Sequence, residues 1–167
     1  MNKDRHLLHI GIDVGSTTTK VAALAPEAGR VLYSDYQRHH ADQVKRVSDA
    51  LWKLYARFPQ ARFRVALTGS GAKRLAGALK LSYIQEVVAN SIALRARYDR
   101  VGTAIELGGQ DAKIIFFRED PLTGQPETTD LRMNGSCAGG TGAFLVGVAA
   151  ILHVPVEQLD SLASPGD

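Results

Sequence analysis

An alternating segment, 7–14, and a β-branched, apolar segment, 18–25, are separated by only three residues, Gly-Ser-Thr. This spacing limits the possible folds most, because alternation is the period of a β-strand and so short a connection makes neighbouring strands antiparallel. A third segment, 31–38, alternates again and follows a turn at 26–29. The chain is therefore predicted to open with an antiparallel three-stranded meander.

Helical and extended patterns alternate in the middle of the chain. Apolar residues recur at helical spacing over 42–58, and Pro59 ends that pattern. The other expected elements are strands at 64–68 and 83–87 and helices at 72–79 and 89–98.

A second glycine-turn hairpin is predicted to begin at residue 101. Its strands are 101–107 and 112–117, and a polar loop with two prolines, 119–127, leads to a third strand at 128–133. A helix is expected at 143–152 and a short one near 156–162.

The two hairpins resemble two copies of one half-domain, the second cut short, in a repeat of architecture rather than of sequence. The predicted domains are accordingly 1–100 and 101–167 of an α/β protein.

The first turn has the residues that a phosphate-binding hairpin needs. Backbone N–H groups in a glycine turn can converge on an anion, and hydroxyls add further donors. Asp13 ends the first strand and can hold hydrated Mg2+, while Lys20 can place its ammonium near the phosphate. The candidate binding residues are Gly15, Ser16, Thr17, Thr18 and Lys20. The alternative is a plain structural hairpin.

The second turn repeats this logic. Glu106 stands at a strand end before Gly108 and Gly109, which are candidate phosphate-binding residues. Glu106, Gln110 or Asp111 could order an attacking water or the Mg2+ shell, so these three and Asp13 are the candidate catalytic residues.

The segments Asp13-Val14-Gly15-Ser16-Thr17 and Glu106-Leu107-Gly108-Gly109 resemble the two phosphate motifs of the actin, heat-shock chaperone and sugar kinase superfamily. The resemblance implies two ribonuclease H-like lobes that close around ATP, with the second lobe truncated here before its adenosine motif.

The one cysteine, Cys137, lies in a glycine-rich turn before the predicted apolar helix. A thiolate at a helix N-terminus is stabilised by the helix dipole, and the glycines leave space beside the sulfur for a metal cluster. From the residues alone, an ordinary cysteine in a helix-initiating turn is the simpler interpretation.

The combination of ELGGQDAK with MNGSCAGGTGAFL resembles the ATP-dependent activators of 2-hydroxyacyl-CoA dehydratases, which belong with the ATPase subunits of benzoyl-CoA reductase. The resemblance implies a homodimer that shares one [4Fe-4S] cluster, with Cys137 as a ligand and a second cysteine further along. It also implies ferredoxin or flavodoxin as electron donor and an acyl-CoA dehydratase or reductase as acceptor. This chain alone is expected to bind ATP weakly or not at all, to carry no stable cluster and to be inactive.

Two other functions remain open. A small-molecule kinase of the same superfamily, such as an amino-sugar or acyl kinase, would have no use for Cys137. A nucleotide sensor of the actin or chaperone type would turn over slowly and lack the cluster.

Composition narrows the class of protein. Apolar residues make up 45% and charged residues 22% of the 167 residues, with a net charge of +3. Lys and Arg are scattered, which disfavours a nucleic-acid surface. No apolar run approaches the roughly 18 residues of a membrane span, and the first residues lack a signal-peptide pattern, so a cytoplasmic protein is expected. His39 and His40 have no acidic or cysteine partner at ligand spacing and are predicted to be surface residues.

Overall fold

The computed structural model describes residues 6–27, 29–122, 124, 126–133 and 140–164. The chain divides into two compact units, residues 1–93 and 94–167. The assignment of these units to two ATPase lobes stays a prediction.

The first unit is built on a five-stranded mixed sheet in the order β3-β2-β1-β4-β5. Strands β1 (Leu7–Val14), β2 (Thr18–Ala25) and β3 (Arg30–Arg38) form the antiparallel meander that the alternation predicts. Strands β4 (Arg62–Thr68) and β5 (Ser82–Tyr83) are parallel to β1 and β4, respectively.

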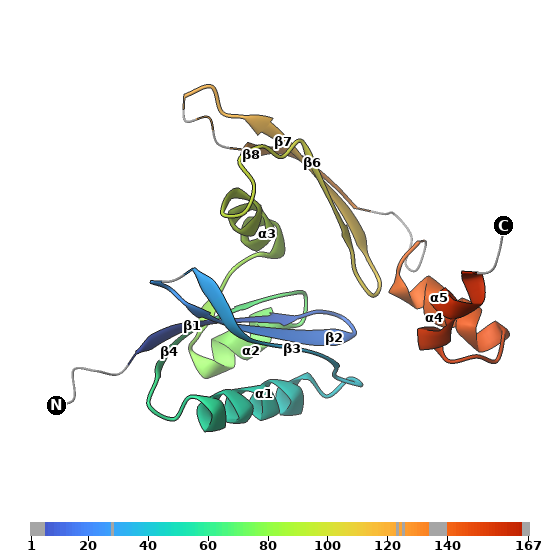
Figure 1. Cartoon of the computed structure of the whole chain (residues 1–167), viewed down its shortest axis with the longest axis horizontal. Helices are drawn as coiled ribbons and strands as arrows, with labels where there is room; N and C mark the ends of the chain where they lie inside the picture. Colours follow the sequence, from blue (N-terminus) through green and yellow to red (C-terminus); the bar gives the residue numbers. More distant parts are fainter. Residues whose placement is uncertain (1–5, 28, 123, 125, 134–139, 165–167) are drawn as a thin grey trace. The chain divides into compact units, whose positions relative to one another are not determined.

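One face of this sheet carries the core. Every second residue of β1 is buried on that face, as are alternate residues of β2. Helices α1 (Gln43–Arg57) and α2 (Ala72–Leu79) cover the face (Figure 1) and bury Val47, Leu54 and Ala76 against it. The alternation thus separates a packed face from a second face, on which Asp13 and Lys20 lie.

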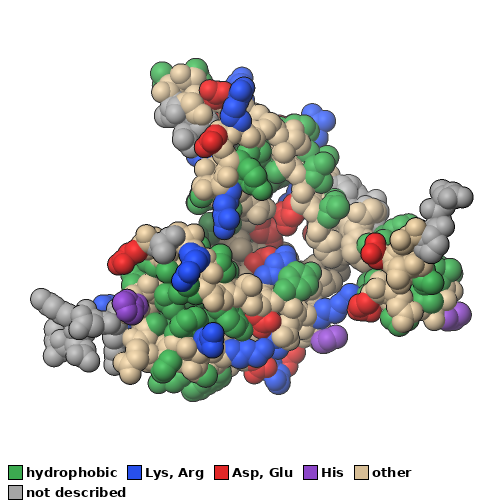
Figure 2. Space-filling model, viewed as in Figure 1, with side chains coloured by type: hydrophobic (Ala, Val, Ile, Leu, Met, Phe, Trp, Pro, Cys, Tyr) green, Lys and Arg blue, Asp and Glu red, His purple; other side chains and the backbone are tan. Residues whose placement is uncertain are grey.

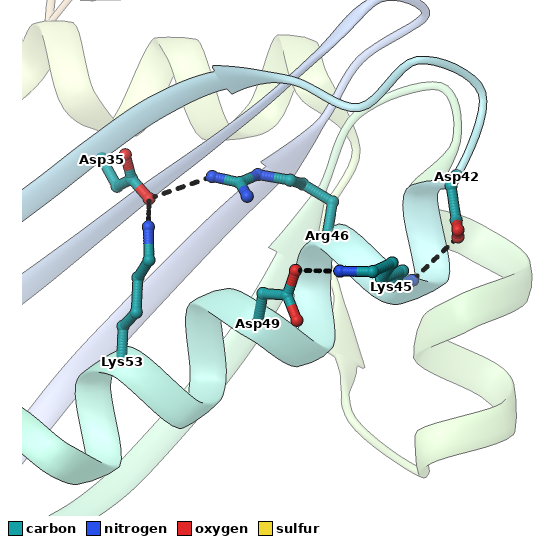
Figure 3. Close-up of polar contacts among 6 residues, drawn as sticks. All are labelled: Asp35, Asp42, Lys45, Arg46, Asp49 and Lys53. Carbon is teal, nitrogen blue, oxygen red and sulfur yellow. Dashed lines mark hydrogen bonds and ion pairs between the residues drawn. The ribbon is translucent and has the colours of Figure 1, made fainter.

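Charged side chains connect α1 to β3 (Figure 3). The Asp35 carboxylate, only 15% exposed, accepts hydrogen bonds from Arg46 at 3.5 Å and Lys53 at 3.3 Å. On the solvent side, a hydrogen bond from Lys45 to Asp49 raises the pKa of Lys45 and lowers the pKa of Asp49. The Asp42 side chain accepts a bond from the Lys45 N–H and caps the helix.

The second unit contains the antiparallel sheet β6-β7-β8, with strands Thr103–Leu107, Ala112–Glu119 and Pro126–Met133. The helical elements that follow are α4 (Gly142–Ile151), the 3-10 turn η1 (Val156–Gln158) and α5 (Leu159–Ala163). Hydrophobic side chains lie on the surface of this helical segment (Figure 2), among them Phe144 and Ile151.

Among the described residues, no single helix is long and apolar enough to cross a membrane. Helix α4 and the segment Val156–Ala163 meet the length and composition criteria only together, as a pair bent by 94°.

Most predicted elements are confirmed, with corrections at their ends. The extended segment predicted at 83–87 is wrong beyond Tyr83, because α3 (Glu86–Arg95) begins at Glu86 and also ends earlier than predicted. The predicted loop at 119–127 is shorter, since β7 extends to Glu119 and β8 begins at Pro126. A proline at the start of a strand removes no internal ladder bond, so its presence there is compatible with pairing.

Candidate functional site

The turn between β1 and β2 brings the predicted phosphate-binding residues together. The Gly15 N–H donates to the Thr18 carbonyl at 2.9 Å, which leaves Ser16 and Thr17 at the tip. Asp13 and Lys20 are cross-strand partners, and the Lys20 ammonium contacts the Asp13 carboxylate at 2.9 Å. Both side chains are partly exposed, at 45% for Lys20 and 30% for Asp13. The pair therefore remains accessible to a ligand.

The loop between β4 and α2 packs against Asp13. Thr68 is the cross-strand partner of Asp13 on β4, and its hydroxyl is buried with no hydrogen-bond partner among the described atoms. Gly69 follows with a φ of +102°, and the Gly71 N–H donates to the Val14 carbonyl at 2.9 Å. The end of β1 is thereby held from the side opposite to β2.

The prediction that His39 is a surface residue is wrong. Its side chain is 6% exposed, and its ring Nε2 lies 3.1 Å from the Gly15 carbonyl oxygen. The Ala41 N–H donates to its Nδ1 at 3.1 Å, and the His39 N–H donates to the Thr17 carbonyl at 3.2 Å. His40, in contrast, is exposed, as predicted. His39 is buried because it lies against a turn 24 positions earlier in the chain, a contact that the sequence spacing of possible metal ligands does not reveal.

The turn between β6 and β7 has the same construction. The Gly108 N–H donates to the Asp111 carbonyl at 2.8 Å, and Glu106 pairs across the strands with Lys113. The Lys113 ammonium lies 3.5 Å from the Glu106 carboxylate. Gln110 at the tip is exposed and Asp111 is half-buried.

The start of α4 contacts this second turn. The Gly142 N–H donates to the Gly108 carbonyl at 3.1 Å, and the Ala143 N–H donates to the Gly109 carbonyl at 2.8 Å. The first N–H groups of a helix have no partner inside the helix, so these carbonyls satisfy two of them.

The two hairpins also share a sequence spacing, which the predicted repeat of architecture did not include. Asp13-x-Gly15 and Glu106-x-Gly108 are each followed by four residues and then a lysine. Lys113 is therefore a further candidate site residue, and the signal that finds it is the alignment of the two hairpins on their carboxylates.

A cavity of about 480 Å3 adjoins strands β1 and β2 of the first hairpin, within the first unit. Asp13 and Lys20 lie at its wall together with the polar residues Ser34 and Thr68, and the remaining lining is largely apolar. The first hairpin thus borders a space that can admit a small organic group.

The metal ligand predicted at Cys137 lies outside the described residues. Among the residues that the structure describes, no group of three or more His, Cys, Asp and Glu side chains could hold a metal ion.

The first unit is thus a mixed α/β fold, and a carboxylate–lysine pair lies on a hairpin in each of the two units. The fold is similar to that of the solved ethanolamine utilization protein EutJ from Carboxydothermus hydrogenoformans, which matches with a TM-score of 0.62 over 94% of this chain and 61% of its own, at 13% identity. The chain belongs to the BadF/BadG/BcrA/BcrD ATPase family, whose model matches residues 10–167.

Several relatives of this chain are named as dehydratase activators. The (R)-2-hydroxyglutaryl-CoA dehydratase activating ATPase of Acidaminococcus fermentans is 30% identical over 157 residues, or 93% of this chain and 57% of the relative. The activator of the 2-hydroxyisocaproyl-CoA dehydratase from Clostridium difficile with bound ADPNP matches with a TM-score of 0.74 and 27% identity, over 96% of this chain and 57% of the other. The chain therefore spans a little over half the length of these relatives.

Proposed function

We propose that this chain is the phosphate-binding part of an ATP-hydrolysing activator that delivers an electron to an acyl-CoA dehydratase or a related reductase. One observation carries the proposal: a chain of the activator family contains two hairpins in which a carboxylate, a glycine turn and a lysine recur at the same spacing.

The residues of the first hairpin suit Mg·ATP. Asp13 supplies the oxygen donor that Mg2+ prefers, and Lys20 supplies a cation that can turn from Asp13 to a phosphate. Thr68 supports this assignment, because its buried hydroxyl has no partner among the described atoms and neighbours Asp13 across the strands. Gly15, Ser16, Thr17 and Thr18 would bind the phosphate chain through the turn.

The second hairpin would bind the same nucleotide from its own turn. Gly108 and Gly109 would offer backbone contacts, and Glu106, Gln110 or Asp111 would position the attacking water. Lys113 would hold Glu106, since the side chain of Lys113 is the more buried of the two, at 12% exposed against 34%.

Cys137 would bind one iron of a [4Fe-4S] cluster shared between two copies of the full-length protein. A cluster of this kind supplies one-electron transfer when it is bound. Ferredoxin or flavodoxin would be the donor, the dehydratase component the acceptor, and the cytoplasm the location.

The test is anaerobic expression of the full-length protein that carries this chain, followed by assays of iron, sulfide and ATP hydrolysis. We expect a brown protein with ATPase activity. Cys137→Ala should lose iron and sulfide and keep nucleotide binding, whereas Asp13→Asn should lose ATPase activity and keep iron.

The rival functions give different results in the same assays. A protein without cluster but with normal ATPase activity would contradict electron transfer. Phosphorylation of an added amino sugar or acyl acid, unaffected by Cys137→Ala, would show a kinase instead.

A further inference from the structure

The tautomer of the buried His39 follows from its two ring contacts. The Ala41 N–H donates to Nδ1 at 3.1 Å, so Nδ1 carries no proton. The proton of the neutral ring is therefore on Nε2, which donates to the Gly15 carbonyl at 3.1 Å.

His39 holds two carbonyls of the first turn at once. The ring binds the Gly15 carbonyl, and the His39 backbone N–H binds the Thr17 carbonyl at 3.2 Å. The described peptide bonds include no cis bond, and the C=O and N–H of a trans peptide point in opposite directions. The N–H groups of Ser16 and Thr18, which share these two peptide planes, therefore point away from His39.

Two N–H groups of one tight turn that point away from the same residue can converge on an anion. Gly15 itself directs its N–H to the Thr18 carbonyl and so closes the turn. Ser16 and Thr18 are thus the donors that the geometry leaves directed outward.

In the second turn, backbone N–H groups rather than a histidine ring bind the turn carbonyls. There, the carbonyl of Gly108, the counterpart of Gly15, is held by the Gly142 N–H, and the next carbonyl is held by the Ala143 N–H. In both hairpins, the carbonyl of the first turn glycine is held by a segment from later in the chain, whereas the second held carbonyl is at Thr17 in the first turn and at Gly109, the counterpart of Ser16, in the second. This recurrence is expected if orientation of the turn peptides, rather than filling of space, is what the later segment supplies.

We propose that His39 is a positioning residue of the first phosphate turn, which orients the Ser16 and Thr18 N–H groups toward a bound phosphate chain. The inference rests on the proposed function, because it takes the ligand to be the phosphate chain of a nucleotide. His39 does not contact the ligand; it acts through the two carbonyls.

The test is a titration of the isotopically labelled full-length protein that carries this chain with magnesium tripolyphosphate, followed by NMR of the backbone amides. In the wild type, we expect the Ser16 and Thr18 amide signals to shift with the added ligand, and the ring spectrum of His39 to show the Nε2–H tautomer. His39→Ala should weaken the apparent affinity about fivefold or more, the effect of a lost orienting hydrogen bond. His39→Gln, whose amide N–H can reach the same carbonyl, should restore most of the affinity.

His40→Ala is the matched control, because it removes an exposed imidazole one residue away. It should bind as the wild type does. The spectrum of each variant away from the turn reports whether the first unit is folded, so a loss of affinity is counted only in folded protein; if His39→Ala does not fold, His39→Gln against His39→Leu makes the same comparison.

Two results overturn the inference. If the wild type and His39→Ala bind tripolyphosphate equally, His39 does not position the turn, although the hairpin still binds phosphate and the proposed function stands. If the wild type shows no shift at Ser16 or Thr18, the inference fails together with the part of the proposed function that assigns phosphate to this hairpin.

Discussion

Substitution of Gly69 by alanine is expected to damage both the fold and the first hairpin. Gly69 has a φ of +102°, a backbone conformation that residues other than glycine rarely adopt. A Cβ atom built there would lie 2.5 Å from Asp13 Oδ1 and closer still to the Val14 carbonyl oxygen. The same carbonyl accepts the hydrogen bond from the Gly71 N–H.

The size of the effect follows from two terms. Backbone strain of this kind costs about 1–3 kcal/mol, and forcing an extra carbon into a packed site costs about as much again. The unfolding free energy should therefore fall by about 4 kcal/mol, which lowers Tm by about 10 °C in a chain of this size. Because the carboxylate of Asp13 must move as well, nucleotide binding by the full-length protein should fall too.

The assay is urea unfolding followed by circular dichroism, with Gly77→Ala as the matched control. Gly77 is exposed within α2, and a Cβ there would meet nothing within 4 Å. Alanine favours a helix over glycine, so this control should gain about 0.5–1 kcal/mol. A Gly69→Ala protein as stable as the wild type would show that the packing of Gly69 against Asp13 and Val14 does not hold in solution.

Two further substitutions test the packing around α1. Asp35→Ala should lower the free energy of unfolding by about 1–3 kcal/mol, because it leaves the largely buried Arg46 guanidinium without its carboxylate. Lys53→Ala, which removes a half-exposed partner, should lower it by about 0.5 kcal/mol or less in the same unfolding experiment. Equal losses would refute the conclusion that Arg46 is the partner that depends on Asp35. Leu54→Ala should cost about 2–5 kcal/mol by opening a cavity under the sheet, whereas Val44→Ala on the exposed side should change stability by about 0.5 kcal/mol or less. A small loss for Leu54→Ala would place this residue outside the core.

The elements of the fold were predictable where a period was long enough to read. Alternation over eight residues in β1 and the β-branched, apolar residues of β2 were enough to predict both strands. The segment after Tyr83 was not predictable, because β5 has only two residues and α3 has no distinct apolar face. Pairing with β4, which is a tertiary contact, makes Ser82 and Tyr83 a strand.

The candidate site was predictable where its residues are neighbours in sequence. The turn glycines, Asp13, Lys20 and Glu106 all lie in short motifs. His39 reaches the first turn only through the meander, which places the end of β3 beside the start of β2. Lys113 was within reach of a comparison between the two hairpins, since the cross-strand register of the first applies to the second.

The pairing of each lysine with its own carboxylate has a consequence for how a nucleotide would arrive. Lys20 and Lys113 lie 2.9 Å and 3.5 Å from opposite charges on the same hairpins. The two charges of each pair largely cancel, so beyond a screening distance of about 8 Å at physiological ionic strength the pair itself presents little net field. These two lysines therefore contribute little to electrostatic steering of a nucleotide, and their contribution to its association rate would change little with salt concentration.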